Sequence, residues 1–174
     1  MSWEKKKTSG VGRKLSQAAP VSNPRLVPLI GEAQSCVVSA ITYRVGNDLD
    51  LETVQELYRA STLGERRPVE DRERMAAMLH NANLVVSAWD GEVLVGIARS
   101  VTDFVYCTYL SDLAVRVSHQ RHGIGRELIR QTQQQGGQAT LILLSAPKAV
   151  DYYPRVGLTQ HPSAWMLKPD ELLR

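Results

Sequence analysis

A short glycine-containing segment, residues 120–126 (QRHGIGR), separates two stretches of opposite character. Before it, residues 109–117 (YLSDLAVRV) are largely apolar and predict a buried strand. After it, residues 126–135 (RELIRQTQQQ) are polar, with apolar positions at helical spacing. The first N–H groups of a helix have no partner inside the helix and point out of its end. Together with the helix dipole they favour a bound anion, and glycine lets a diphosphate approach without a Cβ clash.

Three kinds of phosphate-binding loop can be compared with this segment. A P-loop requires Lys and a hydroxyl residue after its second glycine, and this chain has neither there. A Rossmann fingerprint requires a third glycine where this chain has Leu128, and it opens a βαβ unit, whereas this loop comes late in the chain. The third pattern, [QR]-x-x-G-x-[GA], is that of acetyl-coenzyme A loops. Gln120, Gly123 and Gly125 match all of its fixed positions.

On these residues the chain resembles the GNAT superfamily of N-acetyltransferases, over roughly residues 40–168. Residues 113–115 (LAV) resemble the family's L-A-V just before the loop. Residues 153–158 (YPRVGL) resemble its Y-x-x-x-G-F, with Leu158 in place of the usual Phe. A glycine pattern alone is a weak signal, but the loop, its flanking elements and the downstream Tyr motif together are strong.

The resemblance implies acetyl-CoA as cosubstrate and an amine as acceptor. It implies that backbone groups of Leu113 and Val115 hold the pantetheine arm like an added strand. Backbone N–H groups of residues 121–126 would hold the pyrophosphate, beside the positive side chains of that loop. The expected cofactor-binding residues are Leu113, Ala114, Val115, Gln120, Arg121, His122, Gly123, Ile124, Gly125 and Arg126.

Amide formation from a thioester needs a deprotonated amine and a proton for the departing thiolate. By resemblance, Tyr153 occupies the position of the family's general acid. A phenol with a pKa of about 10 stays protonated at neutral pH and can give its proton to the sulfur. The alternative is that Tyr153 only packs its helix. Its neighbour Tyr152 is expected to pack or to line the wall of the site.

The base is less clearly marked. Some small-amine members of the family have a Glu-Asp pair just before this motif, whereas this chain has Ser111-Asp112. Asp112 could be the base, an anchor for the amine, or a buried acid hydrogen-bonded to backbone. Without a β-bulge, Ser111 and Asp112 face opposite sides of the sheet. Arg66 and Arg67, in a loop between two predicted helices, could meet an acidic acceptor or be solvated.

The fold predicted from periodicity is a layered α/β arrangement, with a mixed, mostly antiparallel central sheet flanked by helices. The resemblance implies that its fourth and fifth strands splay apart. Asp90-Gly91 predicts a hairpin turn. The expected strands are residues 40–44, 84–89, 93–100, 104–117 and 139–144, with a last hairpin of 158–161 and 164–167. The expected helices are residues 49–61, 69–80, 126–135 and 149–155.

The chain has 174 residues and a net charge of +3, unevenly distributed. Residues 1–38 carry +4 and the rest −1, so the basic character belongs to the N-terminal extension. We therefore expect a flexible or loosely docked extension (1–38) and an N-acetyltransferase domain (39–174), with no nucleic-acid-binding face. The apolar segment of residues 26–30 (LVPLI) could dock on the domain or on a second subunit, which leaves a homodimer open.

Two distant cysteines, Cys36 and Cys107, have no metal-ligand spacing and fit a reducing cytoplasm. No apolar stretch reaches the length of a membrane span, and we expect neither a metal nor a membrane partner. The leading prediction is an acetyl-CoA-dependent N-acetyltransferase acting on a small-molecule amine. The alternatives are a protein N-acetyltransferase, a non-catalytic acyl-CoA-binding sensor on the same fold, and a nucleic-acid-associated protein acting through its basic extension.

Overall fold

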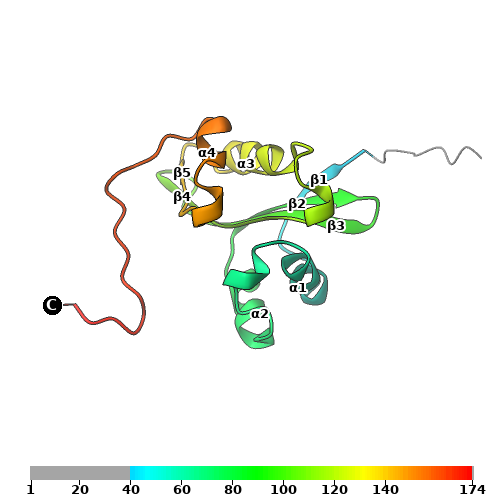
Figure 1. The fold of residues 1–174 in the computed structure, drawn as a ribbon, viewed down its shortest axis with the longest axis horizontal. Coiled ribbons are helices and arrows are strands. Elements are labelled where there is room, and N and C mark those ends of the chain that lie inside the picture. The colour runs from blue at the N-terminus through cyan, green and yellow to red at the C-terminus, as the bar shows by residue number, and fades with distance from the viewer. Residues whose placement is uncertain (1–39, 174) are drawn as a thin grey trace, which may run out of the picture. The chain divides into compact units, whose positions relative to one another are not determined.

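The computed structural model of the chain describes residues 40–173, so that the predicted extension, residues 1–38, lies outside the described part. A five-stranded sheet in the order β1-β2-β3-β4-β5 forms the centre (Figure 1). The first four strands run antiparallel and β5 runs parallel to β4, which confirms the predicted mixed sheet. The strands are β1 (Thr42–Val45), β2 (Leu84–Asp90), β3 (Val93–Thr102), β4 (Cys107–Val115) and β5 (Thr140–Ile142).

Helices cover both faces of this sheet, α1 and α2 on one and α3 and α4 on the other (Figure 1). Of the helices within residues 40–173, none is both long and apolar enough to pass through a bilayer. Three short 3-10 turns lie at Gly64–Arg66, Val117–His119 and Pro147–Ala149. The helices are α1 (Leu51–Arg59), α2 (Arg72–His80), α3 (Ile124–Gln135) and α4 (Tyr152–Arg155).

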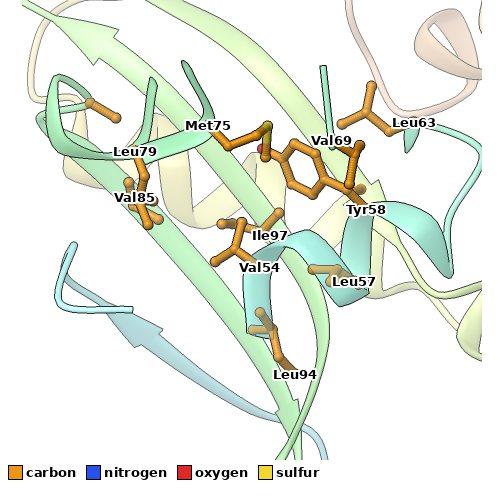
Figure 2. Packing of buried hydrophobic residues seen from close by; sticks show 12 residues of the cluster. Val54, Leu57, Tyr58, Leu63, Val69, Met75, Leu79, Val85, Leu94 and Ile97 are labelled. Atoms are coloured by element: carbon orange, nitrogen blue, oxygen red, sulfur yellow. The ribbon is translucent and has the colours of Figure 1, made fainter. Parts of the chain in front are cut away.

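Helix α1 begins at a side-chain cap and turns an apolar stripe to the sheet. The Asp50 carboxylate accepts a hydrogen bond from the Thr53 N–H at 2.8 Å, which satisfies one of the free donors of the first turn. Val54, Leu57 and Tyr58 follow at helical spacing and are almost fully buried. Figure 2 shows these side chains meeting Leu94 and Ile97 of β3 and Met75 of α2 in one core.

Helix α3 packs against the opposite face, where Gly96 leaves room for it. A Cβ built on Gly96 would lie 3.0 Å from Leu128 Cδ1 and 3.2 Å from Ile124 Cγ2. The absence of that Cβ lets the first turn of α3 approach β3 closely. Ile124 belongs to the glycine segment of residues 120–126, so this contact also fixes the position of that segment over the sheet.

Strands β4 and β5 pair over only a short length. The register joins Cys107, Thr108 and Tyr109 of β4 to residues 140–142 of β5. From Leu110 onward β4 has no strand partner on its β5 side among the described residues. This separation is the splay that the resemblance implied, and it leaves a backbone edge open beside the glycine loop.

A β-bulge interrupts β4 at Ser111. Arg99 pairs with Asp112 and Ser100 pairs with Leu110, so that Ser111 is the extra residue. The bulge changes which side chains share a face. Leu110 packs in the core under α3, whereas Asp112 turns toward Tyr58 of α1. Alternation places Tyr109 on the same face as Asp112.

Two parts of the strand prediction need correction, the long strand before the glycine loop and the last hairpin. The long strand predicted over residues 104–117 begins only at Cys107, because Asp103 Oδ1 accepts hydrogen bonds from the N–H groups of Val105, Tyr106 and Cys107 and holds a tight loop there. The last hairpin, predicted for residues 158–161 and 164–167, is wrong: neither segment forms a strand. These segments are short and exposed, and no ladder partner satisfies their backbone.

The contact at Gly96 gives a stability prediction. We expect Gly96→Val to lower the free energy of unfolding by about 1–3 kcal/mol, because the added side chain must displace Leu128 or Ile124 in a packed core. Chemical denaturation monitored by circular dichroism would measure it. Val93→Ala is the control on the same strand, since Val93 is 49% exposed and should change little. Equal stabilities for the two variants would contradict the close packing of α3 on Gly96.

Candidate active site

A cavity of about 310 Å³ lies where the open edge of β4 meets the glycine loop and α4. Three segments far apart in sequence form its walls: the loop after α1, the end of β4 with residues 119–121, and the start of α4. The cavity brings most of the predicted site residues together. Those that line it are Leu113, Ala114, Val115, Gln120, Arg121, Ile124, Gly125 and Tyr153, joined by Tyr152.

The backbone of the glycine loop leaves N–H groups at the start of α3 without a side-chain cap. Gly123 is the N-cap of α3, with φ of 82°, and has no side chain to occupy the donors, in contrast to the Asp caps of α1 and α2. A Cβ on Gly123 would meet no atom within 4 Å, so the space above it is open. Gln120 Nε2 donates to Val115 O at 3.0 Å and ties the loop to the end of β4.

Gly125 lies directly beneath a tyrosine. A Cβ built on Gly125 would lie 2.9 Å from the Tyr152 hydroxyl oxygen, closer than side chains normally approach. Burial raises the pKa of Tyr152, while the charge of Arg126 lowers it. Tyr152 therefore packs over the start of α3 rather than merely supporting its own helix, and this placement extends the wall role predicted for it.

The remaining residues of the predicted loop face outward. Gly123 and Arg126 line a wider hollow of about 1000 Å³ along the outer side of α3, together with Arg130. His122 is exposed and lines neither hollow. Arg126 has no ion-pair partner within residues 40–173, whereas Arg130 is paired with Glu127.

Tyr153 is half-buried at the cavity wall. Burial raises the pKa of Tyr153 above the ordinary value, and the charge of Arg66 acts in the opposite direction. The phenol is therefore protonated through the neutral range and available as a proton donor. Tyr152 and Tyr153 meet edge to face with ring centroids 5.4 Å apart, which fixes their relative orientation.

Asp112 lies outside the cavity and is the centre of a buried polar cluster. Its side chain has no exposed surface. Oδ1 accepts from Arg67 Nε at 2.6 Å, and Oδ2 accepts from Arg99 Nε at 2.5 Å and from the Tyr58 hydroxyl at 2.8 Å. Burial and the neighbouring carboxylate raise the pKa of Tyr58, so this phenol stays a donor. Both carboxylate oxygens thus accept hydrogen bonds from buried or half-buried side chains.

The same two guanidiniums hold the bulge of β4. Arg67 Nη2 donates to Ser111 O at 2.8 Å, and Arg99 Nη2 donates to Ser111 Oγ at 2.9 Å. Arg99 Nη1 also reaches Met78 O at 3.0 Å, at the end of α2. The Asp112 cluster, meaning Asp112 with Tyr58, Arg67 and Arg99, therefore links α1, α2, their connecting loop, β3 and β4.

This cluster was not predicted, although the sequence carried a signal for it. Arg99 stands within the apolar run of residues 93–102, where a charged side chain needs a buried partner, and Asp112 stands in the next strand.

His119 also has partners, Ser118 Oγ at 2.8 Å and Asp90 Oδ2 at 3.2 Å, and it lines the cavity. In residues 40–173 no three His, Cys, Asp or Glu side chains gather as a metal site.

Comparisons with known proteins agree with this geometry. The chain is 28% identical over 121 residues to an uncharacterized ycf52-like N-acetyltransferase of Prochlorococcus marinus, a match covering 66% of this chain and 65% of that relative's length. The fold is similar to a GNAT family acetyltransferase from Streptococcus pneumoniae, with a TM-score of 0.58, 26% identity, and coverage of 74% of this chain and 99% of that one.

The fold is also similar to that of an aminoglycoside N-acetyltransferase, AAC(6')-Iy, solved in complex with CoA. The TM-score is 0.60 at 16% identity, over 76% of this chain and 96% of that one. The sequence profile of the acetyltransferase (GNAT) domain matches residues 59–164, which include α2, the sheet from β2 onward, the glycine loop and both tyrosines. The chain therefore belongs to the GNAT family of acetyltransferases.

Proposed function

We propose that this protein transfers the acetyl group of acetyl-CoA to a primary amine of a small molecule by direct attack of the amine on the thioester. One observation carries the proposal: a single cavity brings together the free edge of β4, the glycine loop and the phenol of Tyr153. Each of these supplies one requirement of the reaction, namely a place for the pantetheine arm, a place for the diphosphate and a proton donor.

The residues present fit acetyl-CoA on two independent grounds. The uncapped N–H groups at the start of α3, with open space above Gly123, suit a diphosphate, and Arg121 and Arg126 add positive charge. On its β5 side, β4 has no strand partner from residue 110 to residue 115 within residues 40–173. The backbone on that side is therefore free to bind an extended amide-containing arm as a strand would. The relative solved with CoA supports this choice of ligand.

In this proposal Tyr153 acts as the general acid. Its phenol is protonated at neutral pH and lines the cavity at the end of β4. Attack by a neutral amine on the thioester carbonyl forms the C–N bond, and the C–S bond then breaks while the departing thiolate takes the Tyr153 proton. The proton that the amine nitrogen loses passes through water and restores the Tyr153 phenol. A backbone N–H near the end of β4 would stabilise the developing oxyanion.

We propose that Asp112 acts by positioning rather than as the base. A base needs a lone pair directed at the amine or at a water next to it. Both oxygens of Asp112 already accept hydrogen bonds from Arg67, Arg99 and Tyr58, and the side chain is fully buried. The amine then loses its proton to water in the cavity, while Asp112 holds the bulge that shapes the open edge of β4.

The glycine loop gives the first test. We expect Gly125→Asp to weaken coenzyme A binding by about tenfold or more, because the new side chain meets Tyr152 and places a negative charge beside the phosphates. Isothermal titration calorimetry measures this. The control is Gln134→Asp, which adds the same charge at an exposed position near the far end of α3. Parental affinity in the Gly125 variant would refute the assigned diphosphate site.

The second test concerns the acid. We expect Tyr153→Phe to lower kcat by about 100-fold or more with little change in acetyl-CoA affinity, since the variant keeps the ring and loses only the proton donor. Thiol release from acetyl-CoA with a panel of amines provides the assay. Tyr106→Phe is the control, because Tyr106 is 81% exposed and remote from the cavity wall. Full turnover in Tyr153→Phe would remove this residue from the mechanism.

The third test separates the two roles of Asp112. If Asp112 is a positioning residue, Asp112→Asn should lower the free energy of unfolding by about 3 kcal/mol or more, because two buried guanidiniums lose their counter-charge. Glu70→Gln, which removes the partner of Arg59 in an exposed pair, should change the melting temperature little. A variant with parental stability and abolished turnover would instead identify Asp112 as the base.

The alternative function is an acyl-CoA sensor on the same fold. Such a protein would bind coenzyme A at the glycine loop and release no thiol with any amine. The same panel therefore decides between enzyme and sensor, and Lys-containing peptides in it test the protein N-acetyltransferase alternative.

A further inference from the structure

The Asp112 cluster carries an excess of positive charge at the edge of the site. Arg67 and Arg99 share one carboxylate, and within residues 40–173 neither of them contacts a second acidic side chain. Their other N–H groups donate to neutral oxygens of Arg66, Ser111 and Met78. Arg99 is almost fully buried and Arg67 is 21% exposed, so water screens this charge weakly.

Arg66 adds a second cation on the cavity side of the cluster. Its carbonyl oxygen accepts from Arg67 Nη1 at 2.9 Å, which links its position to the cluster. Its side chain is exposed and makes no ion pair in the described part of the chain, not even with the adjacent Glu65. The Arg66 N–H donates to Leu63 O at 2.9 Å, and Leu63 lines the cavity, so that Arg66 lies next to the cavity wall. Its positive charge lowers the pKa of Tyr153, in keeping with this position.

An exposed apolar row continues from the cluster across the sheet. Val101, Tyr109 and Ile142 pair in register on β3, β4 and β5, and are 47%, 39% and 50% exposed. Tyr109 lies on the face of Asp112 because of the bulge at Ser111. The acceptor side of the site therefore combines an apolar surface with free positive charge, and its buried carboxylate is already neutralised.

We propose that the acceptor is an amine carrying a carboxylate or a similar anion, and that Arg66 binds this anion. The inference rests on the proposed acetyltransferase function and names the class of its acceptor. A guanidinium binds a carboxylate through two parallel hydrogen bonds, which fixes orientation as well as adding affinity. Polycationic amines such as spermidine or aminoglycosides would meet like charge at Arg66.

A matched pair of acceptors tests the charge requirement. Para-aminomethylbenzoate and para-aminomethylbenzamide share the amine and the apolar ring and differ only in the anionic group. Thiol release from acetyl-CoA should give a kcat/KM about tenfold or more higher for the benzoate than for the benzamide, with spermidine the poorest acceptor. Equal values for the pair, or a preference for spermidine, would overturn the proposal.

A charge-reversal variant assigns the effect to one residue. Arg66→Glu should bring the ratio of kcat/KM for the benzoate to kcat/KM for the benzamide close to one, whatever its effect on the two values separately. The control is Arg74→Glu, an equal charge change at an exposed position of α2 that has no ion pair in residues 40–173. If the two variants respond alike, the effect is one of overall charge and Arg66 is not the anion site.

A binding measurement distinguishes a failure of this proposal from a failure of the proposed function. Calorimetry of both compounds is performed on the protein with coenzyme A present, so that no reaction is required. If no amine is acetylated but the benzoate binds more tightly than the benzamide, and Arg66→Glu removes the difference, the enzymatic function fails and the anion site stands. If the benzoate shows no binding advantage, the anion site is refuted whatever the turnover.

Discussion

The ion pairs of the Asp112 carboxylate, fully buried between two guanidiniums, are the interactions on which the arrangement of α1, its following loop, β3 and β4 depends. An unpaired charge in this position would cost several kcal/mol, so the surrounding elements must keep their places to maintain its partners. Those partners come from β3, from α1 and from the loop that follows α1. A single ionised side chain thus connects a loop at the cavity with the centre of the sheet.

The bulge at Ser111 and this cluster depend on each other. With regular pairing, Asp112 would face the side of the sheet covered by α3, where the core is made of Leu128, Ile124 and other apolar residues. The extra residue turns Asp112 toward Tyr58, and the two arginines bind the carbonyl and hydroxyl of the extra residue itself. The bulge also lies within the stretch of β4 whose β5-side edge is open, which is the edge proposed to hold the pantetheine arm.

The glycine loop was easier to predict from the sequence than the Asp112 cluster, for a physical reason. Loop binding of a diphosphate uses backbone N–H groups at a helix start, and the residues that permit it, Gly123 and Gly125, are contiguous in sequence. The chain's own periodicity located the sheet and the three longer helices to within a few residues. The prediction of a last hairpin in residues 158–167 was wrong. A local residue pattern can indicate a strand, but a strand forms only where a partner strand satisfies its backbone.

The acceptor side arises from contacts between residues distant in sequence. Arg67, Arg99 and Asp112 come from three segments, and their meeting requires both the bulge and the loop after α1. Sequence reasoning favoured a solvated pair for Arg66 and Arg67 over binding of an acidic acceptor, since adjacent residues give no information on what they face. In the structure Arg67 pairs with buried Asp112, whereas Arg66 is exposed and makes no ion pair within residues 40–173.

The difference between paired Arg67 and Arg66, which makes no ion pair among the described residues, affects the charge near Tyr153. Arg121 lines the cavity together with Tyr153, and the positive charge of Arg66 lowers the pKa of Tyr153. Positive charge near a phenol favours its anion and therefore eases proton donation, while burial opposes this and keeps the phenol protonated until it is needed. In the proposed reaction the same positive charge would lower the affinity of a protonated amine and favour the neutral form. An anionic group on the acceptor would offset the positive potential at the point of binding, which is why the charge of the acceptor, more than its size, should decide which amines this site accepts.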